Sequence, residues 1–277
     1  MKKDAPNYRP EPHKSPEQRS RRSFTKQIAA LAAAPLLINA LGISPVFAQT
    51  AEHPLTPAIG YAKAALEKSN AMSGYECKFV KREVVGKTLI TQQIRLKVRH
   101  EPFSVYMRFE EPHEGREVIY VEGKNNNNLL AHETGLAGLI GTLELSPTSS
   151  QAMAENRYPI SKAGLSNMMK TVIQQWEDET KFGETTVKYY KDAKVGESTC
   201  KVIESIHPQP RKQFKFHMTR LWIDDKTGLA VRVQQFGFPA SADAKPPVIE
   251  DYTFTEIKSD VRLTDKDFDT RNPNYKF

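Results

Sequence analysis

The sequence predicts an α+β fold that is mainly β: a strongly curved antiparallel sheet, or open β-barrel, with two helices covering its concave face. After residue 74, short segments alternate apolar and polar side chains with a period of two, as half-buried strands do. Two other segments repeat apolar residues at steps of three and four, as amphipathic helices do. The short connections are rich in turn-forming residues, which favours hairpins.

The first half of this pattern predicts one helix followed by hairpins. The helix is expected over residues 55–72, with Thr56 as its N-cap, Pro57 at the first helical position and Gly74 just beyond its end. Alternation then predicts strands around residues 75–79, 94–98, 103–109 and 118–122. The turns between them are expected at residues 85–87, 101–102 and 114–115.

The second half predicts another helix and more strands. Residues 125–128 are expected as a polar loop tip, and residues 134–150 as a loop with one weak strand. A helix begins near Ser161, and its apolar stripe runs from Leu165 to Trp176. Further strands are expected at 184–192, 197–207, 213–224, 229–238 and 248–258, with a hairpin turn at 225–228. About ten strands and two helices, without an internal repeat or a linker, predict that residues 49–277 form a single domain.

The N-terminal segment, residues 1–48, looks like a twin-arginine signal peptide. Arg21, Arg22 and Phe24 match the pattern of such signals, although Thr25 stands where Leu is common. An apolar run follows and ends in small residues that suit cleavage between Ala48 and Gln49. The alternative is an uncleaved membrane anchor. We therefore expect export in folded form through the twin-arginine translocase, to the periplasm or cell envelope.

The charge is unevenly distributed along the chain. The formal net charge is +7, but residues 1–48 hold 8 Lys/Arg against 3 Asp/Glu, so residues 49–277 carry only about +2. A chain whose body is nearly neutral is not expected to bind nucleic acid.

The sequence shows no known pattern of catalytic, cofactor or metal-binding residues. GxGxxG, Walker, CxxC, HExxH and GxSxG motifs are absent, so no cofactor, no metal and no enzymatic activity are expected. The tail imitates the start of a calcium loop with Asp265, Asp267, Asp269 and Asn272, but it lacks the required Gly and Glu. We interpret the tail as a docking strap.

The chain has two cysteines, Cys77 and Cys200, both in predicted strands on the apolar phase. An oxidising envelope permits a disulfide between them, which would close a long loop and stabilise the fold by about 4 to 5 kcal/mol. Two buried free thiols are the equal alternative.

Large apolar side chains mark the predicted concave face. They serve either as plain core or as the wall of an apolar pocket, since cores and ligand cavities use the same residue types. The candidates are Phe79, Phe103, Met107, Phe109, Met168, Met169, Val172, Trp176, Phe214, Phe216, Met218 and Trp222.

Four segments carry a resemblance to a known family: residues 99–106, 115–123, 157–160 and 268–273. Through them the chain resembles an exported bacterial family known as a domain of unknown function, placed near the LolA-like carriers of bacterial lipoproteins. The resemblance implies an open β-barrel with a lipid, a lipidated protein or another apolar ligand between sheet and helices, and leaves peripheral membrane contact open. A sensor or scaffold with a filled core is the alternative hypothesis, and a hydrolase the third.

Overall fold

The computed structural model describes residues 52–259 and 261–277, and within them eleven strands form one sheet in the order β6-β5-β4-β3-β2-β1-β11-β10-β9-β8-β7. Every neighbouring pair is antiparallel. The edge strands β6 and β7 do not pair with each other, so the sheet stays open as predicted. The strands are β1 (Gly74–Val85), β2 (Thr88–Arg99), β3 (Ser104–Glu111), β4 (Glu117–Val121), β5 (Leu129–His132), β6 (Thr142–Leu145), β7 (Thr186–Val195), β8 (Ser198–Ile206), β9 (Met218–Asp224), β10 (Ala230–Phe236) and β11 (Val248–Lys258).

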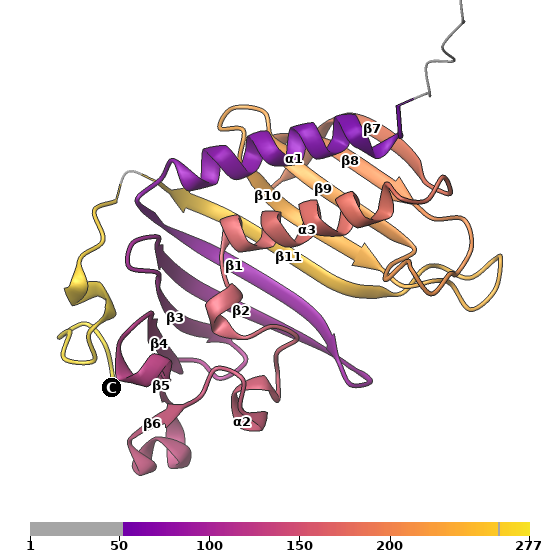
Figure 1. The fold of residues 1–277 in the computed structure, drawn as a ribbon. Helices are drawn as coiled ribbons and strands as arrows, with labels where there is room; N and C mark the ends of the chain where they lie inside the picture. Colours follow the sequence, from indigo (N-terminus) through magenta and orange to yellow (C-terminus); the bar gives the residue numbers. More distant parts are fainter. Residues whose placement is uncertain (1–51, 260) are drawn as a thin grey trace, which may run out of the picture. The chain divides into compact units, whose positions relative to one another are not determined.

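Two long helices, α1 (Leu55–Asn70) and α3 (Leu165–Glu179), lie side by side across one face of the sheet (Figure 1). We call this the helix-covered face. The chain passes from edge strand β6 to edge strand β7 through the short helix α2 (Ser150–Met153) and then α3. No helix among the described residues is long and apolar enough to span a membrane.

The main core lies between the helices and the sheet. Both helices turn an apolar stripe inward, and the deepest side chains include Leu55, Leu165 and Trp176, each fully buried. They meet the alternate residues of the central strands, such as Ile94 and Leu221. The two predicted helices therefore cover the sheet as expected.

Several predicted boundaries shift in the structure. The first helix begins at Leu55 with Pro54 as its N-cap, so Thr56 lies inside the first turn and makes no side-chain cap. The second begins at Leu165 rather than near Ser161, because residues 160–162 form a separate 3₁₀ turn, η3, and Gly164 follows at φ +95°.

Strand β9 starts at Met218, whereas residues 213–217 were expected to be part of it. Strand β5, which directly follows the short 3₁₀ turn η1 (Asn125–Asn127), was not predicted.

The C-terminal strap, residues 264–277, docks on the opposite face of the sheet over β3 and β4. Phe268 of its 3₁₀ turn η4 (Asp265–Phe268) is buried against Ile119 and Val121. The ring of Tyr275 stacks on Tyr106 with centroids 4.0 Å apart. All five residues of β4 are buried, because the strap covers Ile119 and Val121 on one face while Val118 and Tyr120 belong to the main core on the other. The interpretation of the tail as a docking strap is confirmed.

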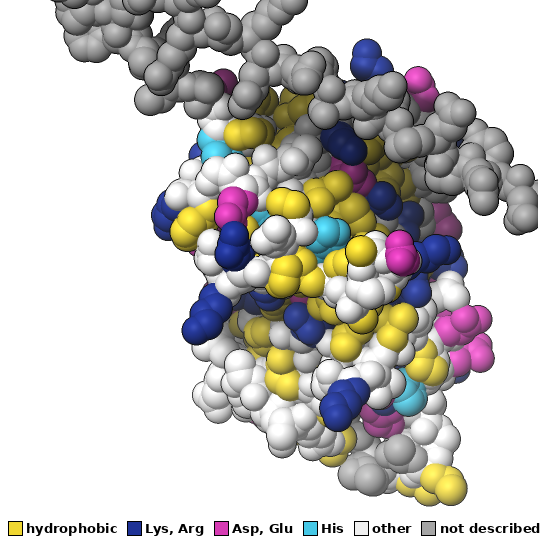
Figure 2. All heavy atoms as spheres, turned by 90° about the vertical axis from the view of Figure 1, so that its right-hand side faces the viewer, with side chains coloured by type: hydrophobic (Ala, Val, Ile, Leu, Met, Phe, Trp, Pro, Cys, Tyr) yellow, Lys and Arg dark blue, Asp and Glu magenta, His cyan; other side chains and the backbone are white. Residues whose placement is uncertain are grey.

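The aspartates of the strap bind to basic side chains of the chain rather than surrounding one point. Asp265 pairs with Arg99 at 2.8 Å and Asp267 with Lys97 at 3.0 Å. In the part of the chain that the structure describes, no three His, Cys, Asp or Glu side chains are grouped to hold a metal ion. Elsewhere on the surface, Figure 2 shows Lys and Arg scattered among apolar and acidic side chains, so both signs of charge are interspersed over this face.

Candidate functional site

A pocket of about 370 Å³ lies on the helix-covered face, between the first half of the sheet, helix α3 and the crossover that precedes it. Strands β1 to β6, β10 and β11 form its floor, while residues 147–164 and α3 form the opposite wall. Most of the lining is aliphatic or aromatic. The apolar lining comprises Phe79, Ile94, Met107, Phe109, Val118, Leu129, Ala131, Leu143, Leu145, Met168, Val172, Val233 and Phe254.

One end of the pocket is polar, because four neighbouring strands change from apolar to polar at the same level. On β1 the inward residue Phe79 is followed two and four residues later by Lys81 and Glu83, which remain buried. Register places Lys81 opposite Gln92 of β2 on one side and Tyr252 of β11 on the other. We call this row and its neighbours Glu83, Gln235 and Glu250 the polar band.

The segment from Glu155 to Tyr158 closes over the polar band. The Lys81 ammonium donates to the Glu155 carbonyl oxygen at 3.2 Å and to the Asn156 side chain. Arg157 donates its backbone N–H to Glu83 at 3.0 Å and its guanidinium to Glu250 at 2.8 Å. These contacts hold the crossover against the sheet, and they explain why buried charges are tolerated here.

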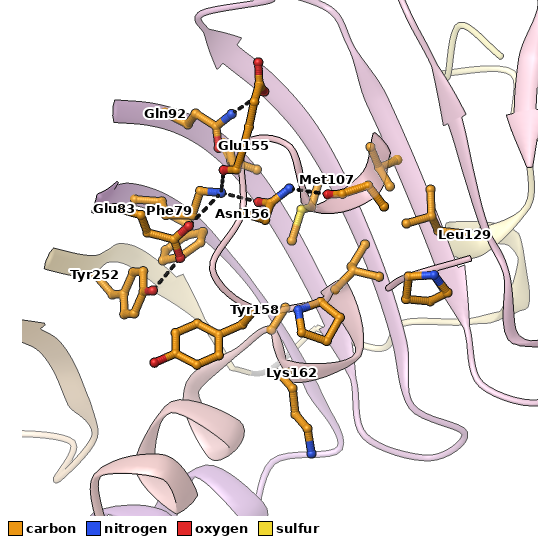
Figure 3. A pocket seen from close by; sticks show the side chains of 18 of the residues that line it. Phe79, Glu83, Gln92, Met107, Leu129, Glu155, Asn156, Tyr158, Lys162 and Tyr252 are labelled. Atoms are coloured by element: carbon orange, nitrogen blue, oxygen red, sulfur yellow. Dashed lines mark hydrogen bonds and ion pairs between the residues drawn. The ribbon is translucent and has the colours of Figure 1, made fainter. Parts of the chain in front are cut away.

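A second group of polar and charged side chains ties the Glu155 side chain to strand β2 and to the connection between β3 and β4. Its carboxylate accepts from Gln92 Nε2 at 3.0 Å, from Arg116 at 2.9 Å and from His113 at 3.1 Å. Arg116 also donates to Glu133 at 2.8 Å. In Figure 3, Glu83, Gln92, Glu155 and Asn156 gather on one side of the pocket, with Met107 and Leu129 on the other.

Burial perturbs the titration of this cluster. It lowers the pKa of the Lys81 ammonium, although Glu83 acts in the opposite direction. It also raises the pKa of the Glu250 carboxyl, against the pull of Lys215 and Arg157. Burial alone would raise the pKa of Glu155, but Arg116 and His113 together hold it below its usual value. Burial therefore penalises the charged forms of Lys81 and Glu250, both of which are buried.

Five of the twelve predicted pocket residues line the pocket: Phe79, Met107, Phe109, Met168 and Val172. The remaining seven are core or lie elsewhere. Met169 and Trp176 are fully buried in the closed core, and Trp176 donates its indole N–H to Ser205 at 3.2 Å. Phe103 packs beside Tyr120, with ring centroids 6.3 Å apart.

The other four lie towards β9, away from the pocket. The ring of Phe214 stacks on that of His207 with centroids 3.7 Å apart. Phe216 and Met218 are buried close to the start of β9. Trp222 points to the opposite face, where the Arg232 guanidinium lies 5.0 Å from its ring.

Cys77 and Cys200 are both buried and free. Cys77 is on β1 and Cys200 on β8, and three strands lie between these two in the sheet. Four strand spacings amount to about 19 Å, well beyond the Cα separation of a disulfide. The structure therefore excludes the disulfide and has the two free thiols. The predicted export residues Arg21, Arg22 and Phe24 and the cleavage residues Ala48 and Gln49 lie outside the described residues.

These features define an α+β protein with an open antiparallel sheet, two covering helices and, between the sheet and α3, a mainly apolar pocket with one polar end. The chain belongs to the family described as protein of unknown function DUF1571, whose model matches residues 72–277. This confirms the expected membership of a domain-of-unknown-function family. The comparison with curated proteins finds no match.

Several solved structures are similar in fold. The lipoprotein LppX of Mycobacterium tuberculosis shares 12% identity at a TM-score of 0.43, covering 76% of this chain and 100% of that one. A LolA superfamily protein of Nitrosomonas europaea shares 9% identity at a TM-score of 0.31, covering 76% and 96%. A DUF1329 family protein of Desulfovibrio piger shares 11% identity at a TM-score of 0.37, covering 78% and 98%.

Proposed function

We propose that the chain is an exported cell-envelope protein that binds one amphipathic molecule, a lipid or the acyl part of a lipidated protein, in the pocket beside α3. The observation that carries this proposal is the division of one pocket into a long apolar wall and a polar end. Each acyl CH₂ exposed to water costs about 0.8 kcal/mol, so a lipid in an aqueous compartment gains from such an enclosure.

The size of the pocket limits the ligand. A cavity of about 150 Å³ holds benzene, so 370 Å³ accommodates about 15 carbon atoms of a ligand at the same density. That corresponds to one acyl chain. We therefore propose that a lipid with several chains would place only one of them here.

The predicted signal peptide supports the proposed location in the cell envelope. A twin-arginine signal at Arg21 and Arg22 would deliver the folded chain to the periplasm or cell envelope, where lipids and lipidated proteins are exchanged between membranes. No catalytic role is assigned to the polar band, and the proposed role is that of a non-enzymatic binding protein.

Native mass spectrometry on protein purified from its own envelope tests the proposal. A co-purifying lipid supports it, and repeated recovery of bare protein favours the scaffold hypothesis instead. Binding of a fluorescent fatty-acyl probe gives a second measurement. Val172→Phe and Ala152→Phe, which fill the pocket from two different walls, should each weaken probe binding at least tenfold.

Glu177→Phe is the matched control, because it adds the same ring to a partly exposed position of α3 that does not line the pocket. The pair that Glu177 makes with Lys63 at 2.6 Å is a surface contact worth little. Probe binding that survives both pocket-filling variants unchanged would contradict the location of the site.

A further inference from the structure

Gln92 is a polar residue of the pocket with one hydrogen-bond acceptor that has no partner among the described residues. It lies on β2, its exposed fraction is 1%, and it lines the pocket. Its Nε2 donates to the Glu155 carboxylate at 3.0 Å. A carboxylate only accepts hydrogen bonds, so this contact fixes which end of the amide is nitrogen. The Gln92 Oε1 atom is buried and has no partner among the described residues.

An unpaired buried carbonyl oxygen is rare in folded proteins and costs more than the hydrogen bond it lacks. A ligand that donates a hydrogen bond at this point would relieve that cost. A ligand that offers only hydrogen-bond acceptors would leave Gln92 Oε1 unpaired. It would also place one of its own acceptor atoms next to that oxygen, which is repulsive. The pocket therefore distinguishes between ligands by their donors.

The cations at this end are already neutralised. Lys81 lies 3.6 Å from Glu83, and Arg116 is shared between Glu133 and Glu155. Lys162, the remaining cation of the lining, is exposed and lies apart from the cluster (Figure 3). An anionic head group placed here would thus meet the carboxylates of Glu83 and Glu155 without an uncommitted cation to balance it.

Resting on the proposed function, we infer that the ligand is a single-chain lipid with an uncharged head group carrying a hydroxyl, of the fatty alcohol or monoacylglycerol type, and that Gln92 Oε1 accepts the hydroxyl hydrogen. The apolar wall holds the chain and the polar band holds the head. Burial lowers the pKa of Lys81 and raises that of Glu250, so this end of the pocket disfavours charged groups, as it would a charged head group.

The test compares three ligands with one alkyl chain of about 14 carbons: the alcohol, its methyl ether and the carboxylate. Each displaces a fluorescent acyl probe from the purified full chain at neutral pH. The alcohol should bind about five- to tenfold more tightly than the ether, which has no donor. The carboxylate should bind most weakly.

The variant Gln92→Met, an unbranched replacement of like length, should abolish the preference of alcohol over ether. Gln93→Met is the matched control: it is the next residue of β2, it points to the opposite face and donates to Glu111 at 2.6 Å. It should keep the preference. The wild-type ligand series decides the inference even if Gln92→Met does not fold.

The outcomes separate the two proposals. If no alkyl ligand binds, the proposed function fails and the choice of head group falls with it. If all three bind equally, a water molecule satisfies Gln92, and only the inference about the head group is overturned. Tightest binding of the carboxylate would overturn that inference too, while leaving a lipid-binding pocket in place.

Discussion

Two adjacent methionines on α3 offer a direct test of where the pocket ends and the closed core begins. Met168 lines the pocket, whereas Met169 does not and is completely buried among helix and sheet residues. Both lie in the interior of the same helix. Their replacement by Ala therefore removes the same atoms from the same backbone, and only the surroundings differ.

The size of the expected effects follows from those surroundings. Met to Ala in a core costs about 2 to 5 kcal/mol, and the value rises with the volume of cavity that remains. Met169→Ala opens a new cavity and should cost about 4 kcal/mol. Met168→Ala enlarges a pocket that already exists, so fewer packing contacts are lost, and it should cost about 2 kcal/mol. Trp176→Ala should cost about 3 to 5 kcal/mol and leave Ser205 without its donor.

Thermal melting and probe binding together read out the difference. For a domain of this size 1 kcal/mol corresponds to about 2 to 4 °C, so the melting temperatures of the two methionine variants should differ by roughly 4 to 8 °C. Binding of the acyl probe should weaken in Met168→Ala and persist in Met169→Ala below its melting temperature. Equal melting temperatures for the two variants would refute the placement of the pocket wall.

Further predictions concern the backbone, the thiols, the strap and the leader. Gly164→Ala should destabilise the fold by about 2 to 4 kcal/mol, because the added Cβ would lie 2.7 Å from the hydroxyl oxygen of Tyr75. Gly123 also has a positive φ but has free space around it, so Gly123→Ala should cost only the backbone strain, about 1 to 2 kcal/mol. A thiol reagent should label neither cysteine until the chain unfolds, and should then label both, because burial raises the pKa of Cys77 and raises that of Cys200 to about 11. A mass lower by two hydrogen atoms in the purified protein, as a disulfide produces, would contradict this. The three strap aspartates have lowered pKa values, so their stabilisation is complete above about pH 4 and lost as the pH falls through those values. The protection of the amides of residues 264–277 against hydrogen exchange, corrected for the intrinsic rate at each pH, should fall there and stay constant between pH 5 and 7. Replacing both arginines at 21–22 by Lys should leave unprocessed precursor in the cytoplasm, and normal processing would refute the twin-arginine assignment.

The fold class follows from the sequence because local periodicity and global arrangement agree. The alternation over 248–258 predicts β11 with the bounds that the structure has. The start of α3 was less predictable, since Ser161 suits an N-cap by residue type. What moves the start is Gly164, whose positive φ lets the chain pass close to Tyr75, a residue 89 positions away in sequence. A contact of that range leaves no mark in local periodicity.

The apolar stripe of α3 shows why only part of the site was predictable. Met168, Met169 and Val172 fit one helical pattern equally well, so periodicity identifies the buried side of the helix and stops there. Whether a residue of that side meets a pocket or a packed core depends on the path of the crossover at residues 147–164, which carries little periodic signal.

The polar band did leave a signal in the sequence. Lys81 and Glu83 continue the phase of Phe79, Gln92 precedes Ile94 by two residues, and Glu250 and Tyr252 precede Phe254 on the same phase. In a strand that ends at a loop, such polar residues are simply solvated. They become a buried band only because β1 pairs with β11, which brings the first and last strands of the sequence together at the centre of the sheet, and because residues 155–158 close over them. Long-range register, which a single sequence does not encode locally, thus turns scattered polar residues into the polar end of a pocket.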